Sequence, residues 1–126
     1  MRRSRVDGGS RLKIILDLKP LSVNDAYRGR RFDTAQKRQY DMKLRLMLPM
    51  VVVPGPYYAI HYRFFLVNFS RTDQQNLLKC LTDGIVKRGI IVDDRRIIKE
   101  IIEKFPSRTD RIEVDITSAE MPAVLT

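Results

Sequence analysis

The sequence predicts a single small α+β domain, because segments typical of strands and segments typical of helices both occur within one short chain. Its 126 residues are enough for one domain with a modest hydrophobic core. Two segments place apolar residues at the spacing of a helix face, which indicates two main helices. β-Branched and aromatic residues favour strands and concentrate in residues 12–18, 57–67, 95–105 and 111–117, so we expect about four to five strands.

The N-terminal residues predict an arm, a strand and a loop, in that order. Residues 1–10 are polar and arginine-rich and contain two glycines. They predict a basic flexible arm, which either contacts phosphate or is only solvated. Residues 12–18 predict a first strand that ends before Pro20, and residues 20–32, with Pro, Ser, Asn and Gly, predict a loop.

An arginine cluster in this loop is a candidate DNA contact. Arg28, Arg30 and Arg31 lie between Tyr27 and Phe32. Guanidinium groups bind phosphate through two parallel hydrogen bonds, and aromatic rings can stack on exposed bases. The alternative is a solvated loop that the two rings anchor to the domain.

A first helix is predicted after this loop. Asp33 or Thr34 can cap its start, and Pro49 stops it at about residue 48. An apolar stripe at helical spacing marks its buried side. The opposite side is either a solvated charged face or a surface that meets DNA. Its basic residues are Lys37, Arg38, Lys43 and Arg45.

A second predicted helix separates two groups of carboxylates. Apolar residues recur at helical spacing over residues 77–86, and Gly89 is the predicted stop. Residues 90–92 predict a short strand that delivers Asp93 and Asp94 at its end. We expect this pair to meet in space with Asp73, the carboxylate that precedes the helix.

Three further strands complete the expected domain. Residues 57–67 predict a central strand. Residues 95–105 space their apolar side chains like a helix, but four isoleucines favour a strand, and a strand is what we expect. Residues 111–117 alternate and predict the last strand, followed by a tail over residues 119–126. The domain is therefore expected to span residues 11–118.

The chain is strongly basic, with a net charge of +9 and a pI of about 10.1. Residues 1–50 carry 13 basic and 5 acidic side chains, whereas residues 51–126 carry 11 and 10. This imbalance favours a polyanionic partner, nucleic acid first and an anionic membrane surface second. Acidic side chains gathered in so basic a protein favour a divalent metal site facing the polyanion, and Arg71 is placed to hold a phosphate beside Asp73.

Several other kinds of site are disfavoured. Cys80 is the only cysteine, so no internal disulfide forms, and its place in the second helix predicts a buried side chain rather than a reactive thiol. His61 lies in a predicted strand without a partner motif for metal ligation.

No segment is long and apolar enough to span a membrane, and no secretory-signal core follows the basic N-terminus. We therefore expect a cytoplasmic protein.

The stretch over residues 73–94 resembles the active-site region of a nuclease family. Its spacing is similar, without a gap, to that of the RusA family of Holliday junction resolvases, whose pattern is Asp-x-Asp-Asn, Lys, Asp and Asp-Asp. The matching residues are Asp73-Gln74-Gln75-Asn76, Lys79, Asp83 and Asp93-Asp94, and two further family elements resemble Pro20-x-Ser22-Val23-Asn24 and Lys104-Phe105-Pro106.

The resemblance implies a fold, an activity and partners. The fold would be a mixed sheet with two main helices in an intertwined homodimer. The activity would be that of an endonuclease using Mg²⁺, for which Mn²⁺ can substitute, with no small-molecule cofactor. The substrate would be a four-way DNA junction, cut by paired symmetric nicks in recombination and repair in a bacterial or phage-infected cell. Two copies suit this substrate because the junction has approximate two-fold symmetry.

The resemblance also implies roles for single residues. Asp73 and Asp94 would be the first metal ligands, with Asp93 the third, and Lys79 would be the essential lysine. Gln75 stands where the family has its second catalytic aspartate. The DNA-binding candidates are the cationic residues Arg71, Arg28, Arg30, Arg31, Lys37 and Arg38 and the asparagines Asn24 and Asn76.

Gln75 leaves three outcomes open. An amide oxygen can ligate Mg²⁺, but it carries no charge and cannot act as a base, so we expect weaker metal binding. The chain would then cut slowly, use another acid such as Asp93, or bind junctions without cutting. The last outcome defines an alternative function, a catalytically impaired junction-binding protein. A basic RNA-binding module is a third hypothesis.

Each of these acidic residues also has a purely structural interpretation. Asp73 can be a helix N-cap, worth about 1 kcal/mol, and Asp93-Asp94 can be a turn after a strand. Asp83 lies one helical turn past Lys79, so we interpret it as the i,i+4 partner of that lysine.

Overall fold

The computed structural model of the chain describes residues 4–5, 11–29 and 32–125. The strands are β1 (Ser4–Arg5), β2 (Arg11–Leu16), β3 (Tyr27–Arg28), β4 (Phe32–Asp33), β5 (Val51–Val52), β6 (Tyr57–Leu66), β7 (Ile97–Pro106) and β8 (Arg111–Ala119). The α-helices are α1 (Val23–Ala26), α2 (Ala35–Met47) and α3 (Leu78–Arg88), and the short 3₁₀ helices are η1 (Phe69–Arg71), η2 (Gln74–Leu77) and η3 (Asp94–Arg96).

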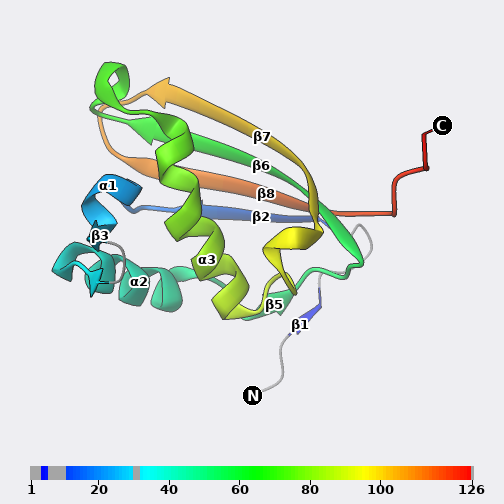
Figure 1. Cartoon of the computed structure of the whole chain (residues 1–126). Helices are drawn as coiled ribbons and strands as arrows, with labels where there is room; N and C mark the ends of the chain where they lie inside the picture. Colours follow the sequence, from blue (N-terminus) through cyan, green and yellow to red (C-terminus); the bar gives the residue numbers. More distant parts are fainter. Residues whose placement is uncertain (1–3, 6–10, 30–31, 126) are drawn as a thin grey trace.

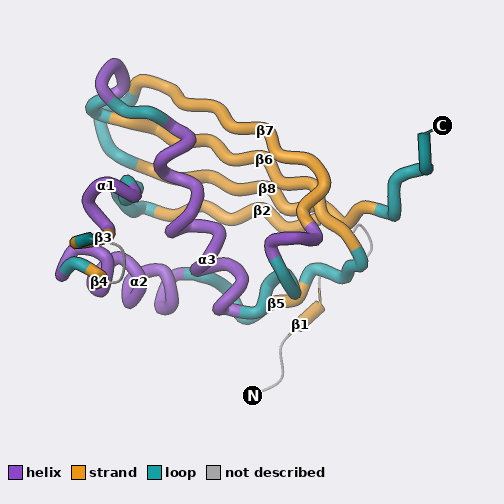
Figure 2. Tube along the Cα trace, viewed as in Figure 1, coloured by secondary structure: helices purple, strands orange, loops and turns teal. Residues whose placement is uncertain are grey.

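Four strands form a mixed sheet in the order β2-β8-β6-β7 (Figure 1). Strand β6 pairs in parallel with β7 and antiparallel with β8, and β8 also pairs antiparallel with β2. Helices α2 and α3 cover one face of this sheet, as the trace in Figure 2 shows. The single α+β domain and the mixed sheet expected from the sequence are therefore confirmed.

The alternation of strand β6 explains how the two faces of the sheet arise. Every second residue from Tyr58 to Leu66 is buried, whereas the residues between them are partly exposed. Successive side chains of a strand point to opposite faces. The buried set therefore faces the helices, and the other set, which includes His61, lies on the open face.

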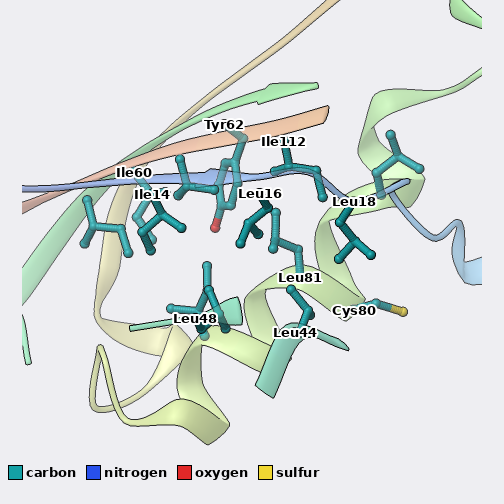
Figure 3. Packing of buried hydrophobic residues seen from close by; sticks show 14 of the residues in the cluster. Ile14, Leu16, Leu18, Leu44, Leu48, Ile60, Tyr62, Cys80, Leu81 and Ile112 are labelled. Atoms are coloured by element: carbon teal, nitrogen blue, oxygen red, sulfur yellow. The ribbon is translucent and has the colours of Figure 1, made fainter. Parts of the chain in front are cut away.

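Sheet and helices meet in one core (Figure 3). Ile60 and Tyr62 of the sheet lie opposite Leu44 of α2 and Leu81 of α3, and all four side chains are buried. The hydroxyl groups of Tyr62 and Thr82 are hydrogen-bonded at 2.9 Å. This buried bond fixes how α3 lies over the central strand.

Helices α2 and α3 approach each other closely at Gly84. A Cβ atom at this position would lie 2.6 Å from Cδ1 of Leu44. Glycine costs about 1 kcal/mol relative to alanine in a helix interior. The close packing of the two helices explains why the chain carries glycine there.

The main helix and strand predictions are confirmed. Helix α2 begins after Thr34, whose Oγ1 accepts the Lys37 amide at 3.2 Å. Helix α3 ends at Gly89, which adopts the left-handed conformation with φ of 83°. Strand β7 is a strand despite its helical spacing, because it pairs along its length with β6. Cys80 is buried, as expected.

Two local predictions are wrong. Residues 90–92 form bends rather than a strand, and their apolar character reflects the burial of Ile90 and Ile91 in the core. Residues 20–32, expected to be a loop, contain α1 and the β3–β4 pair. Helix α1 forms because Oγ of Ser22 accepts the Asn24 amide at 3.2 Å and so caps its first turn.

The expected arm over residues 1–10 is described only at Ser4–Arg5, and its other residues lie outside the described ones. This short segment pairs in parallel with Val51–Val52. None of the described helices has the length and apolar character needed to cross a membrane.

Candidate functional site

A cleft of about 550 Å³ opens where β6 ends and before α3 begins. Its walls come from the α1 region, from the segment between Leu66 and Leu77, and from Asp110. The structure thereby brings together two stretches that are far apart in the sequence. Four predicted site residues line this cleft: Asn24, Arg71, Asp73 and Asn76.

Asp73 is an exposed carboxylate that caps η2. Its Oδ1 accepts the backbone amide of Gln75 at 3.0 Å, and its carbonyl accepts the amide of Asn76 at 3.1 Å. The structural interpretation of Asp73 as a cap is therefore confirmed. Its second carboxylate oxygen has no hydrogen-bond partner in the described part of the chain, so it can still bind a ligand.

Lys104 holds the loop that carries Asp73. Its Nζ donates to the carbonyl oxygens of Phe69 at 2.9 Å and Thr72 at 3.0 Å, and it lies 4.5 Å from the centre of the Phe69 ring. This lysine belongs to the Lys-Phe-Pro element at the end of β7. The element therefore positions the acidic segment against the sheet.

Lys79 lies on the first turn of α3, outside the residues that line the cleft. Its side chain is 60% exposed and its Nζ lies 3.4 Å from Oδ2 of Asp83. The charge of Asp83 raises the pKa of Lys79 above its ordinary value, with a further contribution from Tyr27. The interpretation of Asp83 as an i,i+4 partner of Lys79 is confirmed.

Asp93 and Asp94 have different surroundings at the start of β7. Oδ2 of Asp93 accepts bonds from Nη2 and Nε of Arg95 at 2.7 and 3.0 Å, and Oδ1 accepts the Arg95 amide. Arg95 thereby holds the pKa of Asp93 well below its usual range. Asp94 lies near Glu100, whose pKa is raised by burial and by the charge of Asp94. Among the described residues, the Asp93 carboxylate therefore accepts more hydrogen bonds than the Asp94 carboxylate.

The two groups of carboxylates lie at opposite ends of α3 (Figure 1). Helix α3 has 11 residues, so it alone separates them by about 16 Å. Among the described residues, no three His, Cys, Asp or Glu side chains gather where they could hold a metal ion. The expectation that Asp73 meets Asp93 and Asp94 within one chain is therefore wrong.

The cationic residues expected to meet DNA differ in exposure. Lys37 is only 5% exposed, and its Nζ lies 2.5 Å from Asp41 and 3.6 Å from Asp33. Burial lowers the pKa of Lys37, but these two carboxylates outweigh it and the net shift is upward. The expectation of an exposed Lys37 is thus wrong, because the lysine is buried between two acids.

The remaining cationic candidates lie near the α1 region. Arg28 is exposed on β3, and the exposed Arg38 donates from Nη1 to the Asp33 carbonyl at 3.0 Å. Arg30 and Arg31 lie outside the described residues. The role of all four in DNA binding stays a prediction.

A family model described as Endodeoxyribonuclease RusA matches residues 24–117, which run from α1 into β8. The chain belongs to the RusA family. No curated protein matches it. The RusA match begins at Asn24, so Pro20 and Ser22, which also line the cleft, precede the matched range.

RusA proteins are endodeoxyribonucleases that act on Holliday junctions, so the family implies nuclease activity and junction DNA as the partner. They generally depend on a divalent metal. The described carboxylates of one chain do not fit a centre with three acidic ligands, because Asp73 and Asp94 lie too far apart for one ion.

The sequence did not identify Lys104 and Glu100 as site residues, although both lie near residues of the predicted site. Lys104 could have been found, because it belongs to an element that resembles the family pattern. Glu100 lies within a run of isoleucines on β7 and belongs to no motif, so only the structure reveals its proximity to Asp94.

Proposed function

We propose that this protein is a Mg²⁺-dependent, homodimeric endonuclease that resolves four-way DNA junctions by paired symmetric nicks. It would act in recombination and repair in the cytoplasm of a bacterial or phage-infected cell, and Mn²⁺ would substitute for Mg²⁺. The observation that carries the proposal is the RusA match together with the cleft, whose lining includes Asn24, Arg71, Asp73 and Asn76. The net charge of +9 supports a polyanionic substrate.

The roles in the cleft follow from the chemistry of its side chains. Arg71 offers a guanidinium to a backbone phosphate, and Asn24 and Asn76 offer amide groups to the DNA. Asp73 offers its free carboxylate oxygen as a hard ligand. A divalent ion would neutralise charge on the phosphate and activate a water molecule. Lys79, exposed on the first turn of α3, would offset negative charge near the scissile bond.

A second candidate is a junction-binding protein that does not cut. Gln75 favours it, because this exposed residue puts a neutral amide where the family has a catalytic acid. The two candidates share the fold and the cleft, and only metal-dependent cleavage separates them.

The test compares the native chain with Gln75→Asp on a synthetic mobile four-way junction, with Mg²⁺ or Mn²⁺. We expect slow paired nicking by the native chain and faster nicking by Gln75→Asp. A gel shift in EDTA measures binding separately. Gln74→Asp adds the same charge one residue away and serves as the matched control.

Each outcome decides between the candidates. Cleavage only after Gln75→Asp, with junction binding by both proteins, would make this chain the impaired binder. Neither selective junction binding nor cleavage by either protein would overturn both functions.

A further inference from the structure

A groove of about 440 Å³ lies between α2 and α3 and shares no lining residue with the cleft described above. The two helices form the outer layer on one face of the sheet (Figure 1, Figure 2). None of the lining residues is buried, so the groove is open to solvent. They are Asp41, Met42 and Arg45 of α2 and Gly84, Lys87 and Arg88 of α3.

The hollow of this α2–α3 groove has apolar surroundings. Gly84 has no side chain to fill it, and the Met42 side chain beside it is 65% exposed. Leu46, one turn after Met42 on the same helix, is 78% exposed. Burying such apolar surface against a partner is favourable. The groove therefore has room and an apolar wall for a side chain from outside the described residues.

Two cations stand on opposite walls of the groove, Arg45 on α2 and Lys87 on α3. Both are exposed, and neither has an ion pair or a hydrogen bond within the described part of the chain. The one acid in the lining, Asp41, is already paired with Lys37 at 2.5 Å. The groove therefore presents unneutralised positive charge on both sides of its hollow.

Part of this charge serves the helices themselves. Helices α2 and α3 end close together, since Nε of Arg88 donates to the Leu48 carbonyl at 3.2 Å. Helix C-termini carry partial negative charge, which Arg45, Lys87 and Arg88 offset from the last turns. This role explains the cations, but it explains neither the hollow between them nor the exposure of Met42.

We propose that the α2–α3 groove binds an acidic peptide segment of another protein. An apolar side chain of the peptide enters the hollow and covers Met42, and carboxylates on both sides of it pair with Arg45 and Lys87. A methionine suits this contact because its side chain is flexible and adapts to the shape of a partner. The proposal does not depend on nuclease activity, because the groove and the cleft have no residue in common.

Two other occupants fit the groove less well. DNA would use the cations but not the apolar hollow, because phosphate is bound by cationic and polar groups. A second copy in a two-fold contact would bring the same surface of its own, so that cations would face cations. An acidic peptide with an apolar side chain satisfies both the charge and the hollow.

A short fluorescein-labelled peptide, Asp-Glu-Asp-Phe-Leu-Asp-Glu-Asp, tests the groove by fluorescence anisotropy. We expect saturable binding to the native chain. Arg45→Glu and Lys87→Glu should each weaken it about tenfold, because like charges then face each other. Absence of binding to the native chain would overturn the proposal.

Lys43→Glu is the matched control for Arg45→Glu. It makes the same change of charge at an exposed position, about 160° around α2 from Arg45. Salt screens distant exposed charges, so we expect a loss of less than about twofold. A loss equal to that of Arg45→Glu would mean that the peptide is attracted by the overall charge of the chain, and it would overturn the groove as the site.

The apolar half of the contact is tested separately. A peptide with Ser-Gly in place of Phe-Leu should bind the native chain about tenfold more weakly, because it buries little apolar surface. Met42→Gln should weaken binding of the Phe-Leu peptide but not of the Ser-Gly peptide. Equal binding of the two peptides would overturn the use of the hollow.

Reversing the charges gives a test that a misfolded protein cannot pass. The double variant Arg45→Glu, Lys87→Glu should bind Lys-Arg-Lys-Phe-Leu-Lys-Arg-Lys, which the native chain should not bind. Thermal unfolding of each variant checks its fold, and all of the substituted side chains are exposed. A folded double variant that does not bind the basic peptide would overturn the pairing with Arg45 and Lys87.

The same variants identify the other occupants. If Arg45→Glu lost far more junction affinity than Lys43→Glu in a gel shift, while both bound the acidic peptide equally, the groove would be a DNA contact. If Arg45→Glu changed the oligomeric state in sedimentation and the native chain did not bind the peptide, the groove would be an interface between copies. Either result would overturn the proposal.

Discussion

At the scale of single residues, two cations decide where acidic groups lie. Lys104 fixes the loop before Asp73 through two carbonyl oxygens, and Arg95 fixes Asp93 through both carboxylate oxygens. For the partly buried Lys104, hydrogen bonds from a charged group are worth about 1.5–3 kcal/mol each, whereas the exposed Arg95 orients Asp93 in solvent. Cationic side chains in this protein therefore organise its own acids as well as attract a polyanion.

Replacing Lys104 should loosen the acidic segment. Lys104→Met keeps the aliphatic stem but removes both bonds to the Phe69 and Thr72 carbonyls, so we expect a loss of about 1.5–3 kcal/mol in the free energy of unfolding. Hydrogen exchange should also become faster over residues 69–76. Lys99→Met, on the same strand but without such bonds, is the control. Unchanged exchange in the Lys104→Met protein would contradict the anchoring role.

Asp115 should make the fold sensitive to acid. Burial raises its pKa, but hydrogen bonds from Arg63 at 2.6 Å and Arg11 at 3.3 Å outweigh burial, and the net shift is downward. A depressed folded-state pKa stabilises the fold above the unfolded-state value of about 3.9, and this stabilisation is lost as pH falls through the folded-state pKa.

We therefore expect Asp115→Asn to lower the free energy of unfolding near neutral pH by about 1.5–3 kcal/mol and to flatten its decline in acid. Urea unfolding at a series of pH values measures both effects. Asp17→Asn, at an exposed position, is the control. An equally steep acid decline in the Asp115→Asn protein would disprove the assignment.

At the scale of elements, the sequence predicts helices and strands correctly when their local signals agree with the burial pattern of their side chains. Gly89 ends α3 because only a residue without Cβ adopts its positive φ easily, and that signal is visible in the sequence. Residues 90–92 mislead because apolar residues enter a core as readily in a bend as in a strand. The α1 helix was missed because its four residues are too few to show periodicity.

Packing between α2 and α3 should make Gly84 intolerant of a methyl group. Gly84→Ala gains helix propensity of about 1 kcal/mol, but its Cβ would meet Cδ1 of Leu44, and overpacking costs about 1–3 kcal/mol. We expect net destabilisation in the native background and net stabilisation of about 1 kcal/mol in Leu44→Val, which lacks the obstructing atom. Thermal unfolding of the four proteins measures this change of sign, and the same sign in both backgrounds would refute the contact.

At the scale of the whole molecule, the composition of the site was predictable but its assembly was not. The spacing of Asp73, Lys79 and Asp94 indicates a nuclease family. This spacing can be read from the sequence without knowing how far apart the three side chains lie in the fold. Whether those residues meet depends on the direction of α3 across the sheet, and no local signal encodes that direction. The cleft likewise joins Asn24 to Asp73 through the packing of distant segments.

Net charge should make junction binding strongly dependent on salt. Each phosphate contact contributes about −0.9 to the slope of log affinity against log salt concentration. We expect Arg71→Gln to lower junction affinity and to reduce that slope by about one contact, measured by fluorescence anisotropy at several salt concentrations. Lys87→Gln removes the same charge at the far end of α3. It should change the junction affinity and the salt slope less than Arg71→Gln does. Equal effects of the two substitutions would contradict a phosphate contact at Arg71.

The position of β8 has a consequence for how the chain folds during synthesis. This strand lies between β2 and β6, and Arg11 pairs with Thr117, so the sheet joins residues that are far apart in the sequence. A ribosome must therefore release the residues of β8 before β2 finds its neighbour, about a hundred positions after β2 itself has been made. Until then β6 lacks one of its two partners, and the core cannot close. Folding of this domain is consequently a late, cooperative event that depends on contacts distant in sequence.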